Sequence, residues 1–242
     1  MTAEGTAQAA PPREAAPVPD ERQARRGHTL GKFFAHVLWS TEVVGAENVP
    51  ADGPVLLAAN HSGFADGPVL VGASPRPSHV LIKASMFAGV VGAVLRNIGQ
   101  IPVEEDGGRG SLAMALGVLR RGGVVGVFPE GSRGRGDVAD ARAGVAWLAI
   151  NGGARVVPVA VLGTRRTGEP VGRMPGLRRR LVVEFGEPLS LERAPGTSGR
   201  AAVAHANEEI RVALAALVGS AAERAGLPLP TDDPNREAQA AH

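Results

Sequence analysis

His61 and Asp66 stand five residues apart, directly after an apolar run. Five residues of a continuous helix rotate by about 500°, which would turn the two side chains well apart. Gly63, Gly67 and Pro68 interrupt this segment, so a turn can fold the carboxylate back onto the imidazole ring. A carboxylate that holds one ring nitrogen fixes the tautomer and leaves the other nitrogen to accept a proton. The pair fits a general base acting on a hydroxyl group, with a purely structural hydrogen bond as the alternative.

A second polar segment, FPEGSRGRG at 128–136, follows the apolar run Val124–Phe128. Its glycines let the backbone approach a ligand, and Ser132, Arg133 and Arg135 offer hydrogen-bond donors to an anion. The segment lacks the G-x-x-x-x-G-K-[ST] pattern of a P-loop. It predicts an anion-binding loop, with a flexible basic turn as the alternative.

The elements that must hold these two segments alternate between apolar strands and helical patterns. The strand candidates are Val55–Ala59, His79–Lys83, Gln100–Val103, Val124–Phe128, Val156–Leu162 and Leu181–Phe185. Helical patterns fall at 85–97, 110–121, 139–152 and 200–224. This succession predicts an α/β fold with a largely parallel or mixed central sheet flanked by helices. Because ligands gather at the carboxyl ends of parallel strands, we expect both polar segments at one edge of the sheet.

A segment ahead of the sheet has the spacing of an amphipathic N-terminal helix. Its apolar stripe consists of Leu30, Phe33, Phe34, Val37 and Leu38, with basic residues at or before the start. That combination is typical of a helix lying in a lipid interface with its basic flank on anionic headgroups. Packing of the helix on the sheet is the alternative that the pattern equally allows.

The composition argues against several classes of protein. The chain has no cysteine, which excludes a thiol nucleophile, cysteine-ligated zinc and a disulfide scaffold. Aromatic residues make up only 3%, and no tyrosine occurs, which argues against nucleic-acid binding by base stacking. The longest nearly apolar run, Met86–Leu95, is about half the roughly 20 residues of a spanning helix. Any contact with a membrane is therefore expected to be peripheral.

The two ends of the chain differ in composition from its middle. Residues 1–27 are rich in Pro, Ala and charge without apolar periodicity and predict a disordered N-terminal tail. Residues 226–242 predict a disordered C-terminal tail, which leaves one domain over 28–225. The arginines Arg165, Arg166 and 173–180 bracket a Gly/Pro-rich connection. We expect them to be solvated, or to contact anionic lipid or an acyl carrier.

Taken in order, these segments resemble the glycerolipid acyltransferase family typified by 1-acyl-sn-glycerol-3-phosphate acyltransferase. The resemblance covers most of residues 42–190. Its blocks are VVGAENVPADGPVLLAANHSGFADGPVL with the histidine–four residues–aspartate pattern, HVLIKASMF with its lysine, FPEGSRGRG, ARAGVAWLA, VVPVAV and VVEFGEPL. It implies an O-acyltransferase domain at 28–225.

The resemblance also implies roles for individual residues. His61 would be the catalytic base and Asp66 its orienting partner. Glu130, Gly131 and Arg133 would bind the acceptor's glycerol phosphate, and Pro158 would lie on the acyl-donor side. Beside these implied roles, Ser132, Lys83 and Arg109 are further candidates for binding substrate. The acceptor would be a lysophospholipid, lysophosphatidate, and the donor acyl-CoA or acyl carrier protein. No metal, other cofactor or nucleic acid is expected, and the protein would sit peripherally on the cytoplasmic, inner face of the cell membrane.

One position departs from the family pattern. The family's second block typically ends in an arginine that contacts the acceptor's phosphate, whereas GQIPVEE places Glu105 there. Arg109, four residues on, could reach the same space. The acceptor therefore stays open at this point, with another lysolipid or a hydroxylated lipid as the alternative. A catalytically silent membrane-binding relative is the further alternative, and acyl chain length, donor type and oligomeric state are also open.

Overall fold

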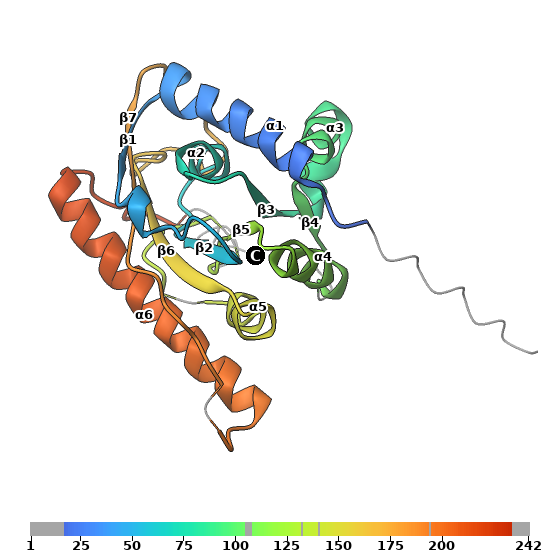
Figure 1. The fold of residues 1–242 in the computed structure, drawn as a ribbon. Helices are drawn as coiled ribbons and strands as arrows, with labels where there is room; N and C mark the ends of the chain where they lie inside the picture. Colours follow the sequence, from blue (N-terminus) through green and yellow to red (C-terminus); the bar gives the residue numbers. More distant parts are fainter. Residues whose placement is uncertain (1–16, 105–107, 132, 140, 194, 234–242) are drawn as a thin grey trace, which may run out of the picture.

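A computed structural model describes residues 17–104, 108–131, 133–139, 141–193 and 195–233. Glu105 and Ser132, both singled out above, lie outside the described residues. The described residues form one seven-stranded sheet with helices on both faces (Figure 1). The fold is therefore the α/β class that the sequence predicts.

The sheet is mixed, with strand order β1-β7-β6-β2-β5-β3-β4. The strands are β1 Ser40–Val44, β2 Val55–Ala59, β3 Ser78–Lys83, β4 Ile101–Val103, β5 Val124–Val127, β6 Arg155–Leu162 and β7 Arg180–Phe185. Strands β6, β2, β5, β3 and β4 run parallel, while β7 is antiparallel to β6 and parallel to β1. Every predicted strand is present, with bounds that differ by one residue at most. Strand β1 was not predicted, because its alternate residues are exposed at the sheet edge and its sequence STEVV has no continuous apolar run.

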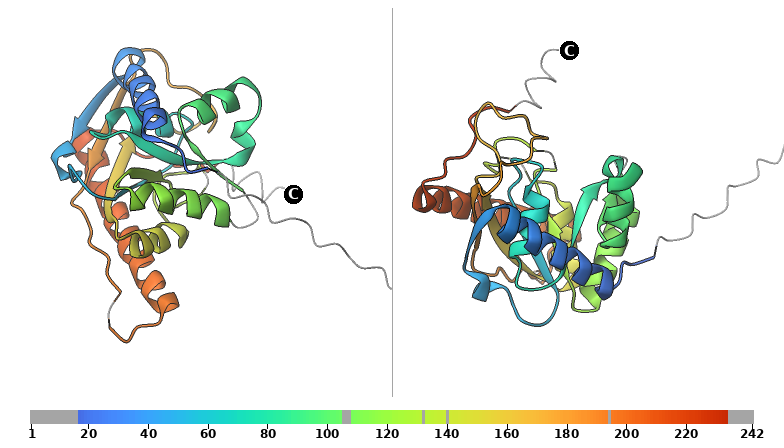
Figure 2. Two further views of the ribbon diagram at one scale, coloured as in Figure 1. Left: turned by 45° about the vertical axis from the view of Figure 1, so that its right-hand side comes forward. Right: turned by 90° about the horizontal axis from the view of Figure 1, so that it is seen from above.

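The helices form a layer on each face of the sheet (Figures 1 and 2). They are α1 Glu21–Lys32, α2 Asp66–Ala73, α3 Gly89–Asn97, α4 Arg109–Arg120, α5 Gly144–Gly152 and α6 Gly199–Ala225. Apolar residues of α4, α5 and α6 cover one face, and α2 with the end of the N-terminal helix covers the other. Helix α3 lies beside the β4 edge (Figure 2). No helix within the described parts of the chain has the length and apolar character needed to cross a bilayer.

The sequence predicts that Gly63, Gly67 and Pro68 interrupt regular structure; Gly63 does lie in the turn, but Gly67 and Pro68 lie inside helix α2. The helix begins at Asp66, so Pro68 falls in its first turn. The backbone N–H that proline lacks would have no helical partner there, and proline is therefore tolerated. His61 lies ahead of the helix, and the turn predicted between the two residues is present.

Both predicted tails prove partly structured. Helix α1 begins at Glu21, inside the predicted tail 1–27, because Asp20 and Gln23 form a reciprocal capping box. After α6, Leu227 and Leu229 pack against the apolar cluster beside that helix. The segment 226–233 is thus part of the folded domain and not the predicted tail.

The predicted apolar stripe of the N-terminal helix is only partly used for packing. Helix α1 continues through a wider π-helical turn at Phe33–Leu38. The buried face of this element consists of small residues, Ala24, Gly27, Gly31 and Ala35, while Phe33 and Val37 are about half exposed, at 48% and 55%. Packing against α2 and exposure of an apolar edge therefore coexist on one helix.

Two glycines set the distance between α1 and α2. A methyl group on Gly31 would lie 2.7 Å from the backbone nitrogen of Gly72, and one on Gly72 would collide with the Gly31 carbonyl. The two helix backbones are therefore in direct contact.

We expect Gly72→Ala to destabilise the protein by about 1–3 kcal/mol, because overpacking forces the helices apart. Gly67→Ala in the same helix is the matched control, since a methyl group there meets nothing within 4 Å. It should be neutral or stabilising by up to about 1 kcal/mol through helix propensity. Urea unfolding of both variants measures the difference, and equal stabilities would contradict this account of the packing.

Candidate active site

Three loops meet at the carboxyl edge of the sheet because three neighbouring strands run parallel. Strand β2 lies between β5 and β6 and is parallel to both. The loops that follow these strands begin at Asn60, Phe128 and Gly163, and they leave the sheet on the same side. Both polar segments of the sequence are therefore at one edge, as predicted.

Asn60 fixes the point at which the first loop leaves the sheet. Its side-chain oxygen accepts a hydrogen bond from Val161 N at 2.7 Å, and its amide donates to Val161 O at 3.2 Å. The side chain thus continues the β2–β6 ladder by one step after the backbone has turned away. Asn60 is fully buried, so its polar atoms need these partners.

The His61 and Asp66 side chains are in contact, as the spacing predicted. His61 Nδ1 lies 2.8 Å from Asp66 Oδ2. With Nδ1 held by the carboxylate, Nε2 is the nitrogen that can accept a proton. The imidazole ring also stacks on Phe128, with ring centroids 4.1 Å apart and planes inclined by 19°. The ring is thereby held by a carboxylate at its edge and an aromatic ring on its face.

The Asp66 carboxylate is fully buried and receives further hydrogen bonds from its surroundings. Backbone N–H groups of Ser62 and Gly63 donate to Oδ2 at 2.7 and 2.9 Å. The Thr164 hydroxyl donates to Oδ1, and its own oxygen lies 3.2 Å from Ser62 Oγ. A buried carboxylate is stable only when such donors replace water. Asp66 is therefore fixed by the loop after β2 and by the loop after β6.

Glu130 connects the second loop to the first. Its Oε1 accepts a hydrogen bond from His61 N at 2.7 Å. Burial raises the pKa of Glu130 to about 7, the nearby Asp137 and Asp66 carboxylates also raise it, and backbone donors at His61 and Val138 oppose the shift. The carboxyl group holds the backbone of the predicted base. Its role toward the acceptor, implied by the family resemblance, stays a prediction.

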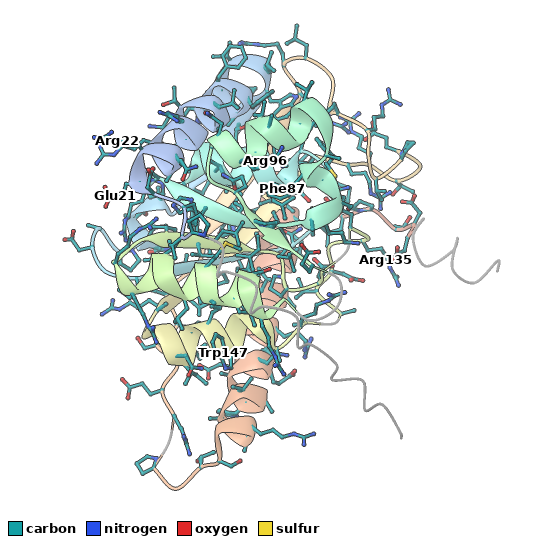
Figure 3. All side chains as sticks on the ribbon, turned by 90° about the vertical axis from the view of Figure 1, so that its right-hand side faces the viewer. Glu21, Arg22, Phe87, Arg96, Arg135 and Trp147 are labelled. Carbon is teal, nitrogen blue, oxygen red and sulfur yellow. The ribbon has the colours of Figure 1, made fainter. Side chains whose placement is uncertain are left out.

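The other described residues of the loop after β5 include a glycine and two arginines with distinct contacts. Gly131 has φ +70°, and a methyl group there would collide with the Arg142 side chain. The Arg133 guanidinium lies 5.1 Å from the centroid of the Phe64 ring, and burial lowers its pKa although Asp66 opposes that shift. Arg135 points into solvent (Figure 3) and lies 3.6 Å from Asp137. The loop therefore carries two arginines, and its backbone contacts His61 through the hydrogen bond from Gly134 N to His61 O at 3.0 Å.

The other predicted site residues lie at different distances from this centre. Lys83 ends β3 and Arg109 begins α4, so both are at the carboxyl edge, and both are exposed. Pro158 is buried in the middle of β6, opposite Ala58, and its carbonyl accepts a hydrogen bond from Gly186. The structure does not bring Pro158 next to His61, and its expected place on the acyl-donor side stays a prediction.

Two residues after β6 were missed from the sequence as parts of the site. Thr164 bonds Asp66, and Arg165 is buried, with 2% of its side chain exposed, although solvation or contact with lipid was expected for it. The signal available was their position, since polar residues that directly follow a buried parallel strand lie at the ligand-binding edge. Arg165 is therefore a structural partner of the loops and not a solvated cation.

The raised pKa of Glu130 predicts a specific pH dependence of stability. Its pKa is about 7 when folded against an ordinary value of 4.5. A raised carboxyl pKa contributes stability that is present below pH 4.5 and is lost as the pH rises through 7. We expect Glu130→Gln, which keeps an acceptor for His61 N, to be more stable relative to wild type at pH 8 than at pH 5.

The difference should be about 1–3 kcal/mol, since one unit of pKa shift corresponds to about 1.4 kcal/mol. Chemical denaturation at the two pH values measures it. The exposed Glu47→Gln provides the control for loss of one negative charge. If Glu130→Gln changes stability equally at both pH values, burial of Glu130 does not shift its titration.

Comparisons with known proteins agree with this arrangement. The family model described as Acyltransferase matches residues 40–162. The 1-acyl-sn-glycerol-3-phosphate acyltransferase of Bacillus subtilis (strain 168) is 32% identical over 161 residues, covering 65% of this chain and 78% of the relative. The enzyme of the same name from Borreliella burgdorferi is 32% identical over 127 residues, covering 50% of this chain and 51% of the relative.

A solved structure shares the fold. The crystal structure of the 1-acyl-sn-glycerophosphate (LPA) acyltransferase PlsC from Thermotoga maritima superposes with a TM-score of 0.60. It is 23% identical in sequence, and the match covers 80% of this chain and 79% of that one. At this identity the likeness concerns the arrangement of helices and strands.

Proposed function

Because the chain belongs to the Acyltransferase family and is an O-acyltransferase, we propose that it transfers a fatty acyl group to the free hydroxyl of lysophosphatidate. The product would be phosphatidate, and the donor a thioester of coenzyme A or acyl carrier protein. The observation that carries this proposal is the contact between His61 and the buried Asp66 carboxylate beside the cationic loop at 128–135. Relatives named for acylation of 1-acyl-sn-glycerol-3-phosphate support the choice of acceptor.

In the proposed reaction, His61 Nε2 removes the proton from the acceptor hydroxyl as its oxygen attacks the thioester carbonyl. The carbon–sulfur bond of the tetrahedral intermediate then breaks, and the proton on His61 passes to the departing sulfur. Asp66 keeps the ring in the required tautomer and stabilises its protonated form. General-base assistance of this kind contributes about 10²–10⁴-fold to the rate. The chemistry proceeds by direct transfer and requires no covalent acyl-enzyme.

The acceptor's phosphate would be bound by the cations at the same edge. Arg133 lies over the Phe64 ring in the loop after β5, and Arg109 begins the helix after β4. An arginine fork matches the geometry of a phosphate group. Lys83 at the end of β3 supplies a further positive charge. We propose that these three side chains select an acceptor with an anionic head.

His61→Ala should lower the rate of acyl transfer to lysophosphatidate by about 10²–10⁴-fold, because the hydroxyl loses its base. The exposed His205→Ala on α6 is the matched control and should retain the wild-type rate. Thin-layer separation of radiolabelled phosphatidate measures product with each donor type. A folded His61→Ala protein that acylates at a near wild-type rate would refute the assignment.

The choice of acceptor has its own test. Wild-type protein offered equal amounts of lysophosphatidate, lysophosphatidylcholine and a hydroxylated lipid should acylate lysophosphatidate fastest. Arg109→Ala should raise the KM for lysophosphatidate about tenfold or more, as expected when one charged hydrogen bond to phosphate is lost. A preference for an acceptor without an exposed phosphate would favour the alternative, an acyltransferase for another lysolipid or a hydroxylated lipid.

We also propose that the protein binds the cytoplasmic face of the membrane through an apolar surface at this edge. This surface, the rim patch, consists of Phe33, Val37, Met174 and Leu177, all of them 42–74% exposed. Hydrogen bonds from Arg178 N to Leu38 O and from Trp39 Nε1 to Pro175 O join the helix end to the loop. The exposed Lys32, Arg173 and Arg178 flank it. Apolar side chains with basic neighbours suit a surface of anionic lipid.

The double variant Phe33→Ser/Val37→Ser should weaken binding to vesicles containing anionic lipid by about tenfold or more, since two half-exposed apolar side chains are lost. Val212→Ser removes an equally exposed valine from α6 and serves as control. Vesicle sedimentation measures both variants. Unchanged binding of the double variant would exclude the rim patch as the membrane contact.

A further inference from the structure

Arg165 is a buried cation that bonds the loops after β2, β5 and β6. It follows β6 directly, and only 2% of its side chain is exposed. A guanidinium has five N–H donors in a rigid plane and accepts no hydrogen bond. Burying it is unfavourable unless those donors are satisfied and the charge is paired.

All five donors of Arg165 have acceptors. Nε donates to Ser62 O at 3.0 Å, and Nη2 donates to Gly134 O at 3.0 Å and to Asp232 O at 2.8 Å. Nη1 donates to Glu169 O at 3.0 Å and to both carboxylate oxygens of Asp232 at 3.0–3.1 Å. The acceptors come from four segments. They are the loop after β2 that carries His61 (the His61 loop), the loop after β5 that carries Glu130 (the Glu130 loop), the loop after β6 and the segment after α6.

Two of these acceptors bracket the residues of the proposed reaction. The Ser62 carbonyl belongs to a residue whose N–H donates to Asp66. Gly134 donates its own N–H to His61 O at 3.0 Å, while its carbonyl accepts from Arg165. Arg165 therefore holds Ser62, the residue after His61, and Gly134, which bonds the His61 carbonyl.

The residue that pairs with the charge of Arg165 is Asp232, near the C-terminal end of the described chain. Asp232 lies in the segment after α6, and this segment is fastened by the hydrogen bond from Thr231 N to the Thr167 hydroxyl at 3.1 Å. The neighbouring Asp233 lies so close to the Glu130 loop that a methyl group on Gly134 would be 2.9 Å from its carboxylate. The described end of the chain thus returns to the active-site edge.

We infer that Arg165 and Asp232 form a clasp that fixes the His61 loop against the Glu130 loop, and that the segment after α6 is therefore required for catalysis. Arg165 is a positioning residue, since it touches only the backbone of the loops and Asp232. The kinetic part of this inference rests on the proposed function.

Arg165→Lys is the main test. Lysine keeps the charge opposite Asp232, so the variant should fold, but it lacks the planar fork and cannot hold Ser62 O and Gly134 O together. We expect kcat, expressed per folded protein, to fall about tenfold to 100-fold, because small misplacements of reacting groups are costly. The KM values for both substrates should change less than about threefold. A folded variant with wild-type kcat would overturn the clasp.

Variants of Asp232 test the role of the carboxylate that pairs with Arg165. Asp232→Asn should lower kcat to a similar extent, and Asp232→Glu, which restores a carboxylate at a partly exposed position, should recover it to within about threefold of wild type. Asp52→Asn in the exposed turn before β2 is the control and should behave as wild type. Failure of the glutamate to recover more activity than the asparagine would overturn the assigned pairing.

A spectroscopic measurement separates this inference from the proposed function. The ring-nitrogen resonances of His61 report its tautomer and its contact with Asp66, and no substrate is needed to observe them. We expect them to shift in Arg165→Lys and Asp232→Asn but not in Asp52→Asn. Unchanged resonances in both clasp variants would overturn the inference. Wild-type protein that fails to acylate lysophosphatidate would instead refute the proposed function. The clasp would still be tested by the His61 resonances of the variants, because they are measured without substrate.

Discussion

The buried carboxylate of Asp66 is the group around which the candidate active site is organised. It is fully enclosed, and it is held by the His61 ring, two backbone N–H groups and the Thr164 hydroxyl. Asp66 is also the first residue of α2, where the helix dipole favours a negative charge. A charge can remain in such a place only if every donor is positioned in advance. The turn before α2, the start of that helix and the loop after β6 are therefore all constrained by one side chain.

The mixed sheet gathers the remaining parts at the same edge. Parallel β6, β2 and β5 send their following loops to one side, which brings Thr164, His61 and Glu130 together from distant parts of the sequence. Antiparallel β7 begins at that edge, and β1 runs parallel to β7, so the N-terminal helix also ends there. The exposed apolar side chains of the rim patch consequently lie at the edge that carries the base. This arrangement suits a substrate with an anionic head and an apolar chain.

Charged groups at this edge have contrasting environments. Glu130 is buried against the His61 backbone, and its raised pKa reflects that burial. Arg165 is buried as well, but its donors are fully used by carbonyl groups and by Asp232. Arg109 and Lys83 are exposed at the ends of their elements. The buried Glu130 and Arg165 hold the loops, whereas Arg109 and Lys83 are open to solvent.

The sequence by itself determined the α/β class, six of the strands and the meeting of His61 with Asp66. These features depend on continuous apolar runs and on a turn of a few residues, which are local properties of the chain. Only the tertiary structure decided that STEVV forms β1, that α2 follows the turn, and that Pro158 lies in mid-strand away from His61. It also decided the partner of Arg165, because Asp232 is 67 residues away and no periodicity links the two. Burial gives a charged residue its role, and burial is set by neighbours that are remote in sequence.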